Sequence, residues 1–147
     1  MVKGKNINEE TLLATDYLNH FNEIVMLIDM LPSMPECFED ARAWQPKSYP
    51  QHFRDSCFRD KELAIYAYDN SPDQYRLPFD ETIDRINEAV LLGLDKVAEA
   101  LDDASRLAHT TSTVSRSVQQ LMDVAGAIIH GHEPSMDQSA IDHIMAL

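Results

Sequence analysis

The residues with the clearest potential for chemistry are histidines and carboxylates on segments expected to be helical. His20 and Glu23 are three residues apart, which places both side chains on one helix face. In di-metal helical bundles, Glu-x-x-His pairs on two helices project inward and bind the ions together. This chain has no second such pair, and His130 and His132 would point to different sides of a helix. A metal protein or enzyme using His20 and Glu23 is therefore an alternative hypothesis, and we expect no bound cofactor.

A helical histidine can also carry a phosphoryl group. Histidine phosphotransfer domains resemble this chain in size, in acidity and in being four-helix bundles. Their usual motif places a lysine and a glycine soon after the histidine, and neither His20 nor His109 is followed by that pattern. The sequence also lacks a Gly-x-Ser-x-Gly nucleophile motif and a glycine-rich phosphate loop. A phosphotransfer-like role is a further alternative, and the residues favour a protein that is not an enzyme.

Basic and aromatic residues gather in the segment from Trp44 to Lys61, within an otherwise acidic chain. The triplet Phe-Arg-Asp occurs twice there. If the rings and guanidinium groups of the two triplets were exposed together, they would form an anchor for an acidic or phosphorylated partner. Alternatively, the rings hold the segment against the core while the arginines lie at its rim, and this is the interpretation we favour. The candidate anchor residues are Phe53, Arg54, Phe58 and Arg59.

Charge and composition exclude several classes of protein. The 147 residues carry a formal net charge of -13, from 25 acidic and 12 basic side chains. Such a surface repels nucleic acids and anionic membranes. Two cysteines, Cys37 and Cys57, are too few for a disulfide framework, and no run is apolar enough to span a bilayer. We therefore expect a cytoplasmic protein with no nucleic-acid or membrane partner.

The elements that position these residues are predicted to be helices, because only 4 glycines are present and apolar residues recur at steps of three and four. One such stripe runs from Leu13 to Leu31, in a helix expected to begin at an N-cap, Asn8, and to stop at Pro32. The longest helix is predicted to start at Pro78, with apolar positions from Phe79 to Ala104. This stripe resembles a coiled-coil seam, so a homodimer is a further expectation.

The rest of the chain predicts shorter helices and one more long one. Short helices are expected from Ser33 to Trp44, around His52, and from Asp60 to Tyr68. Another stripe runs from Val114 to Ile128, and Gly131 is expected to cap it. The hydroxyl-rich residues 109–113 either break the chain between two helices or lie within one. The sequence thus predicts an all-α antiparallel bundle of three or four helices with extra short helices in its first half. Residues 1–134 are expected to form one domain and residues 135–147 a short tail.

The tail carries a recognisable pattern between Met136 and Met145. It resembles the short peptide by which the flagellar switch protein FliM and the chemotaxis phosphatase CheZ dock onto the response regulator CheY. That peptide typically reads Ser-Gln-x-x-Ile/Val-Asp-x-Leu-Leu, and Asp137 here replaces its serine. The positions that match it or replace it conservatively are Gln138, Ile141, Asp142, Ile144 and Met145.

The resemblance implies a helix that binds in a groove of the partner. Ile141, Ile144 and Met145 would share its apolar face, and Gln138 and Asp142 would lie at the edge. CheZ also carries an Asp and a Gln four residues apart on its bundle helix, and the nearest counterpart here has Gln120 and Val124 instead. The expected function is therefore that of a non-enzymatic regulatory or interaction protein, such as a bacterial signalling or chemotaxis adaptor that docks a receiver domain.

Overall fold

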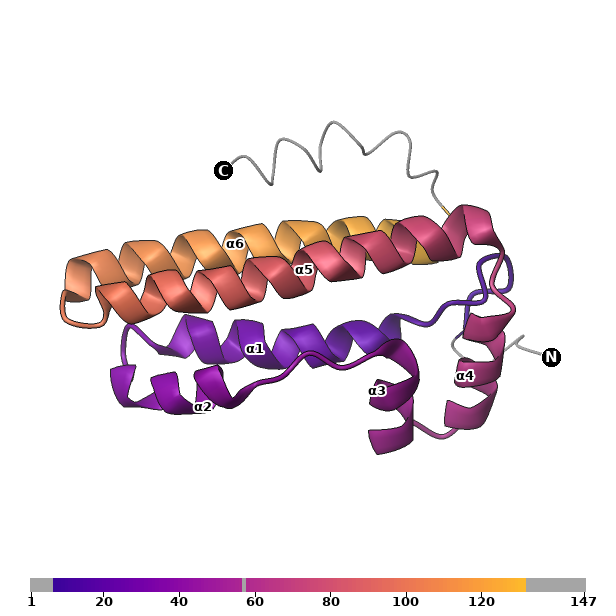
Figure 1. Cartoon of the computed structure of the whole chain (residues 1–147), viewed down its shortest axis with the longest axis horizontal. Coiled ribbons are helices and arrows are strands. Elements are labelled where there is room, and N and C mark those ends of the chain that lie inside the picture. The colour runs from indigo at the N-terminus through magenta and orange to yellow at the C-terminus, as the bar shows by residue number, and fades with distance from the viewer. Residues whose placement is uncertain (1–6, 57, 132–147) are drawn as a thin grey trace.

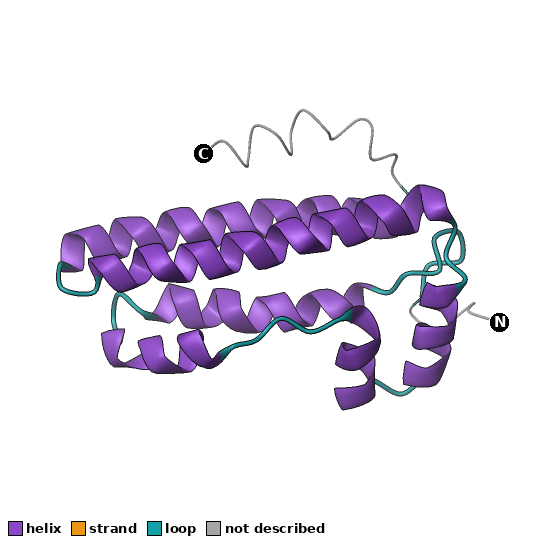
Figure 2. Cartoon of the chain, viewed as in Figure 1, coloured by secondary structure: helices purple, strands orange, loops and turns teal. Residues whose placement is uncertain are grey.

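The computed structural model describes residues 7–56 and 58–131, and this part of the chain contains helices and turns but no strand (Figures 1 and 2). The prediction of an all-α fold is therefore confirmed. The elements in chain order are η1 (Thr15–Leu18), α1 (Asn19–Met30), η2 (Pro35–Cys37), α2 (Phe38–Ala43), α3 (Tyr49–Asp55), α4 (Lys61–Asp69), α5 (Asp73–Ala100) and α6 (Ala104–Ile129).

The two longest helices, α5 and α6, form an antiparallel hairpin, and α1 runs antiparallel to α6 along one face of it (Figure 1). The short helix α2 packs against α5 on the same face. A turn at 101–103 joins the long helices, where the Asp103 carboxylate accepts hydrogen bonds from the backbone N–H groups of Ser105 and Arg106. This N-cap satisfies two donors that the first turn of α6 would otherwise leave free.

The predicted apolar stripes form the core. Along α5, the side chains of Ile86, Val90, Leu94 and Val97 are buried, and α6, which packs against α5, buries Val114, Val118, Leu121, Ala125 and Ile128 at a similar spacing. Burial of each such side chain contributes roughly 1.5–3 kcal/mol. The α5 stripe is thus covered within the chain. The homodimer stays a prediction, and its interface would have to use other surfaces.

The predicted start of the first helix is wrong. Asn8 accepts hydrogen bonds from the N–H groups of Glu10 and Thr11, as an N-cap does, but it closes only a turn. Leu12 then adopts a left-handed φ of 61°, which no helix can continue through. The Thr11 hydroxyl donates to the carbonyl of Ile129, and the Ser71 hydroxyl donates to that of Thr11. These long-range bonds hold the segment in a non-helical path, so η1 starts only at Thr15.

One other boundary differs from the prediction, and the structure decides an alternative that the sequence left open. Helix α5 begins at Asp73, five residues before Pro78, so it continues through this proline, which lacks an N–H for the helix and crowds an earlier carbonyl. The hydroxyl-rich residues 109–113 lie within α6 and do not break it. Thr111 and Thr113 donate to carbonyls four residues earlier, which satisfies their hydroxyls without disrupting the helix. Gly131, with a φ of 92°, ends α6 as predicted.

At Gly93, α5 lies close against α6, since a Cβ atom there would overlap the side chain of Val114. We expect Gly93→Ala to lower the free energy of unfolding by about 1 kcal/mol, because overpacking of about 1–3 kcal/mol exceeds the helix-propensity gain of alanine. In a Val114→Ala background the same change should be neutral or stabilising. Urea unfolding of the four proteins measures this coupling.

Gly126 provides the matched control, since a Cβ there would meet no atom within 4 Å. Gly126→Ala should raise the free energy of unfolding by roughly 0.5–1 kcal/mol, through helix propensity alone. An equal effect of Gly93→Ala with and without Val114 would show that the helices do not touch at this point.

Candidate functional site

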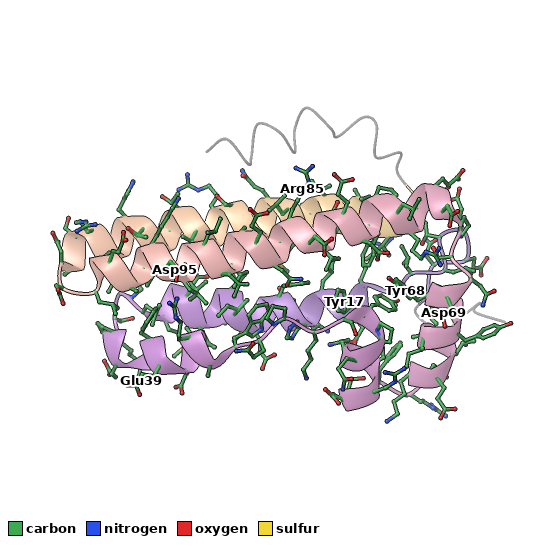
Figure 3. The ribbon with its side chains drawn as sticks, in the orientation of Figure 1. Tyr17, Glu39, Tyr68, Asp69, Arg85 and Asp95 are labelled. Carbon is green, nitrogen blue, oxygen red and sulfur yellow. The ribbon has the colours of Figure 1, made fainter. Side chains whose placement is uncertain are left out.

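Aromatic rings from distant segments gather in one cluster between η1, α1, α3, α4 and α5. The rings lie 4.5–6.2 Å apart between centroids, in stacked, tilted and edge-on arrangements. Tyr17 and Tyr68, labelled in Figure 3, lie near one another at the end of the bundle where α3 and α4 pack. We call this the aromatic cluster; its members are Tyr17, His20, Phe21, Trp44, Tyr49, His52, Phe53, Phe58, Tyr68 and Phe79.

His20 lies inside this cluster and only 5% of its surface is exposed. Its ring stacks on Trp44 at 4.7 Å, and the indole N–H of Trp44 donates to the backbone carbonyl of His20. Nδ1 of His20 lies 3.9 Å from a Glu23 carboxylate oxygen, whereas Nε2 is buried without a well-formed hydrogen bond to a described residue. Its side chain is therefore a packing element of the core, shielded from a phosphoryl donor.

Glu23, the other residue of the hypothetical metal pair, is exposed. Within residues 7–56 and 58–131, no three histidine, cysteine or carboxylate side chains come close enough together to hold a metal ion. His109 is exposed on α6, far along the chain from the pair. Among the described residues, the contacts therefore add no further metal ligand to His20 and Glu23, and they add no motif that would support phosphotransfer.

The structure adds a carboxylate–imidazole pair that sequence reasoning missed. Oδ2 of Asp16 lies 3.0 Å from Nε2 of His52, although the two residues are 36 positions apart. His52 packs edge-on against Tyr17 and lies 6.2 Å from the His20 ring. The pair fixes the orientation of the imidazole and ties α3 to η1. No spacing in the sequence could have indicated it, because its members come from separate elements.

The two Phe-Arg-Asp triplets divide their side chains between core and solvent. Phe53 is fully buried and Phe58 half-buried, with their ring centroids 5.2 Å apart. Arg54 and Arg59 are exposed, and neither forms an ion pair with a described residue. The structure therefore brings the two rings together on the core side. The two guanidinium groups remain available to solvent.

Helix α5 carries exposed apolar side chains. Leu91 and Leu92 are about half exposed. A groove of about 250 Å³ beside Gly93 also includes Lys96 and His109. These exposed side chains are where the described scaffold could meet another protein.

The predicted docking residues in the tail lie outside the described residues. They are Gln138, Ile141, Asp142, Ile144 and Met145. The described chain ends at Gly131, where the positive φ turns the backbone away from the axis of α6.

Comparisons with protein-family models, with curated proteins and with solved structures found no match to this chain. None of the helices formed by the described residues is both long and apolar enough to cross a membrane.

Burial lowers the pKa of His20. His52 and Lys47 act in the same direction, while the backbone of Gln45 and the Glu23 carboxylate oppose it without cancelling it. The unfolded chain therefore binds a proton more readily, and stability should be lost as the pH falls below about 6.5. We expect His20→Phe, which keeps the stacked ring but cannot be protonated, to reduce this loss. Urea unfolding at about pH 7.5 and about pH 5.5 measures the difference, which is at most about 1.4 kcal/mol per pH unit for one group.

The exposed His109 supplies the control, since His109→Phe makes the same substitution at a position outside the core. If His20→Phe loses as much stability on acidification as the wild type, the buried imidazole is not the group responsible.

Proposed function

We propose that this chain is a helical protein-interaction and regulatory module that docks a response-regulator receiver domain. The observation that carries the proposal is the sequence pattern of Gln138, Ile141, Asp142, Ile144 and Met145. Three apolar positions at steps of three and one, flanked by polar residues at defined places, fit recognition of an amphipathic helix in a groove. The proposed role is regulatory: the chain engages the partner and no reaction is assigned to it.

The described scaffold supports the proposal by where it ends. Gly131 closes α6 at one end of the bundle, and six residues lie between it and Gln138. The seven residue steps from Gly131 to Gln138 can span at most about 25 Å. A partner could then bind the tail without displacing a core helix.

The proposal predicts that the tail, and not the scaffold, supplies the binding energy. Full-length protein should bind a receiver domain from a panel, more strongly when a beryllofluoride phosphoryl mimic activates it, whereas a version ending at Glu133 should not bind. Ile141→Ala combined with Ile144→Ala should weaken binding by about 10- to 100-fold, since buried apolar anchors dominate such interfaces. Calorimetric titration gives the dissociation constants.

A matched pair on the scaffold serves as the control. Leu91→Ala combined with Leu92→Ala removes a similar apolar area from exposed positions of α5, and it should leave receiver binding unchanged. Binding that survives removal of the tail, or that depends on Leu91 and Leu92 instead, would overturn the proposal. So would failure of the full-length protein to bind any receiver in either state.

A further inference from the structure

A pocket of about 280 Å³ lies where the aromatic cluster meets α5 and the segment between α2 and α3. Its floor is aromatic, formed by Tyr17, Tyr49, Tyr68 and Phe79, and Pro46 and Pro50 form part of its wall. The polar part of the lining comes from Lys47 and Ser48 before α3 and from one face of α5. Asp80, Asp84 and Asn87 are spaced four and three residues apart and so lie along that face.

The hydrogen bonds already made around this pocket leave acceptors unused. The Tyr17 hydroxyl donates its proton to the carbonyl of Lys47, and the Tyr68 hydroxyl donates to Asp80 at 2.7 Å. Each phenol oxygen therefore keeps lone pairs but has no proton left to offer. The amide oxygen of Asn87 is buried without a hydrogen-bond partner among the described residues. Together with the Asp84 carboxylate, these groups favour a ligand that donates hydrogen bonds.

Two cations lie at this pocket, Lys47 in its lining and Arg76 beside Asp80, and each forms an ion pair with a carboxylate outside the lining. The Lys47 ammonium lies 3.0 Å from Asp55, on the neighbouring helix α3. Arg76, one turn before Asp80, pairs with Asp73 and donates to the carbonyl of Asp69. Burial raises the pKa of the Asp80 carboxyl, the Tyr68 hydrogen bond and the Arg76 charge oppose this without cancelling it, and the neighbouring Asp84 raises it further. A positive charge in the pocket would relieve that repulsion.

We infer that this pocket binds an organic cation, a guanidinium or ammonium group, held by Asp80 and Asp84 against the aromatic floor. Carboxylates supply charge-assisted hydrogen bonds to such a group, and aromatic rings attract it through their quadrupoles. The inference concerns a different part of the molecule from the proposed receiver-docking tail and does not depend on it.

The size of the pocket limits the ligand. Sites for drug-sized molecules usually measure about 300–1,000 Å³, so this pocket accommodates a small cation or one side chain and no large cofactor. A guanidinium also fits the chemistry best, because its planar fork can bind a carboxylate and stack on a ring at once. The cation has two possible sources, a free cationic metabolite and an arginine or lysine side chain of a partner protein.

Calorimetric titration of the full-length protein tests the inference with a matched pair of probes. N-acetyl-arginine amide should bind with a dissociation constant in the millimolar range or tighter. N-acetyl-citrulline amide, its neutral isostere, should bind at least about tenfold more weakly, because it lacks the charge. Agmatine and a Gly-Arg-Gly peptide then separate the two sources. Tighter binding of agmatine indicates a free metabolite, and tighter binding of the peptide indicates a protein side chain.

Three variants connect binding to this pocket. Asp80→Asn and Asp84→Asn should each weaken binding of N-acetyl-arginine amide by about tenfold, and the amide oxygen introduced by Asp80→Asn can still accept the Tyr68 proton. Glu88→Gln makes the same charge change on an exposed position of α5 outside the pocket, and it should change binding by less than about twofold. Circular dichroism and urea unfolding show that the variants remain folded.

Two results would overturn the inference. In the first, neither the arginine amide nor agmatine binds the wild type saturably at concentrations up to about 10 mM. The other is binding that Glu88→Gln weakens as much as Asp80→Asn and Asp84→Asn do, since it would then reflect the overall negative charge and not the pocket.

Discussion

The structure depends on one contact above all, the burial of the apolar stripes of α5 and α6 against each other and against α1. The α5–α6 hairpin extends over the whole length of the bundle (Figure 1), and its stripes supply most of the large buried side chains of the second half. Gly93 allows the two helix backbones to approach closely beside Val114. Because a half-buried helix of this length has no other means to shield its stripe from water, the first half of the chain must cover it.

The way in which the first half of the chain covers the α5–α6 hairpin determines where the aromatic cluster forms. Short helices and turns make few backbone bonds of their own, so side chains bind the backbone of distant segments instead. The Tyr49 hydroxyl accepts the N–H of Ala14, and the Trp44 indole donates to the carbonyl of His20. These bonds fix η1, α1 and α3 relative to one another. The pocket beside Asp80 is a consequence, because it forms where that assembly meets the face of α5.

The two proposed binding regions are chemically distinct. The tail pattern is apolar with polar edges and suits a groove in a protein partner, whereas the Asp80 pocket offers carboxylates and aromatic rings to a cation. A chain with a net charge of -13 attracts cations in general, and the pocket adds an aromatic floor to that charge. A regulatory module with both features could respond to a small cation or to a basic partner while the tail engages a receiver domain.

Sequence periodicity alone determined the fold class, the apolar stripes of the long helices and the cap at Gly131, because these follow from local spacing and backbone preference. It could not determine that Asn8 starts only a turn, since that outcome depends on the bond between Thr11 and Ile129, 118 positions away. The same holds for the site. Sequence reasoning selected His20 and the Phe53–Phe58 segment as candidates, but only the tertiary structure buried the histidine and paired Asp16 with His52. Contacts between distant elements leave no periodic signal in the chain, and these contacts decide which polar groups are satisfied and which remain free to bind.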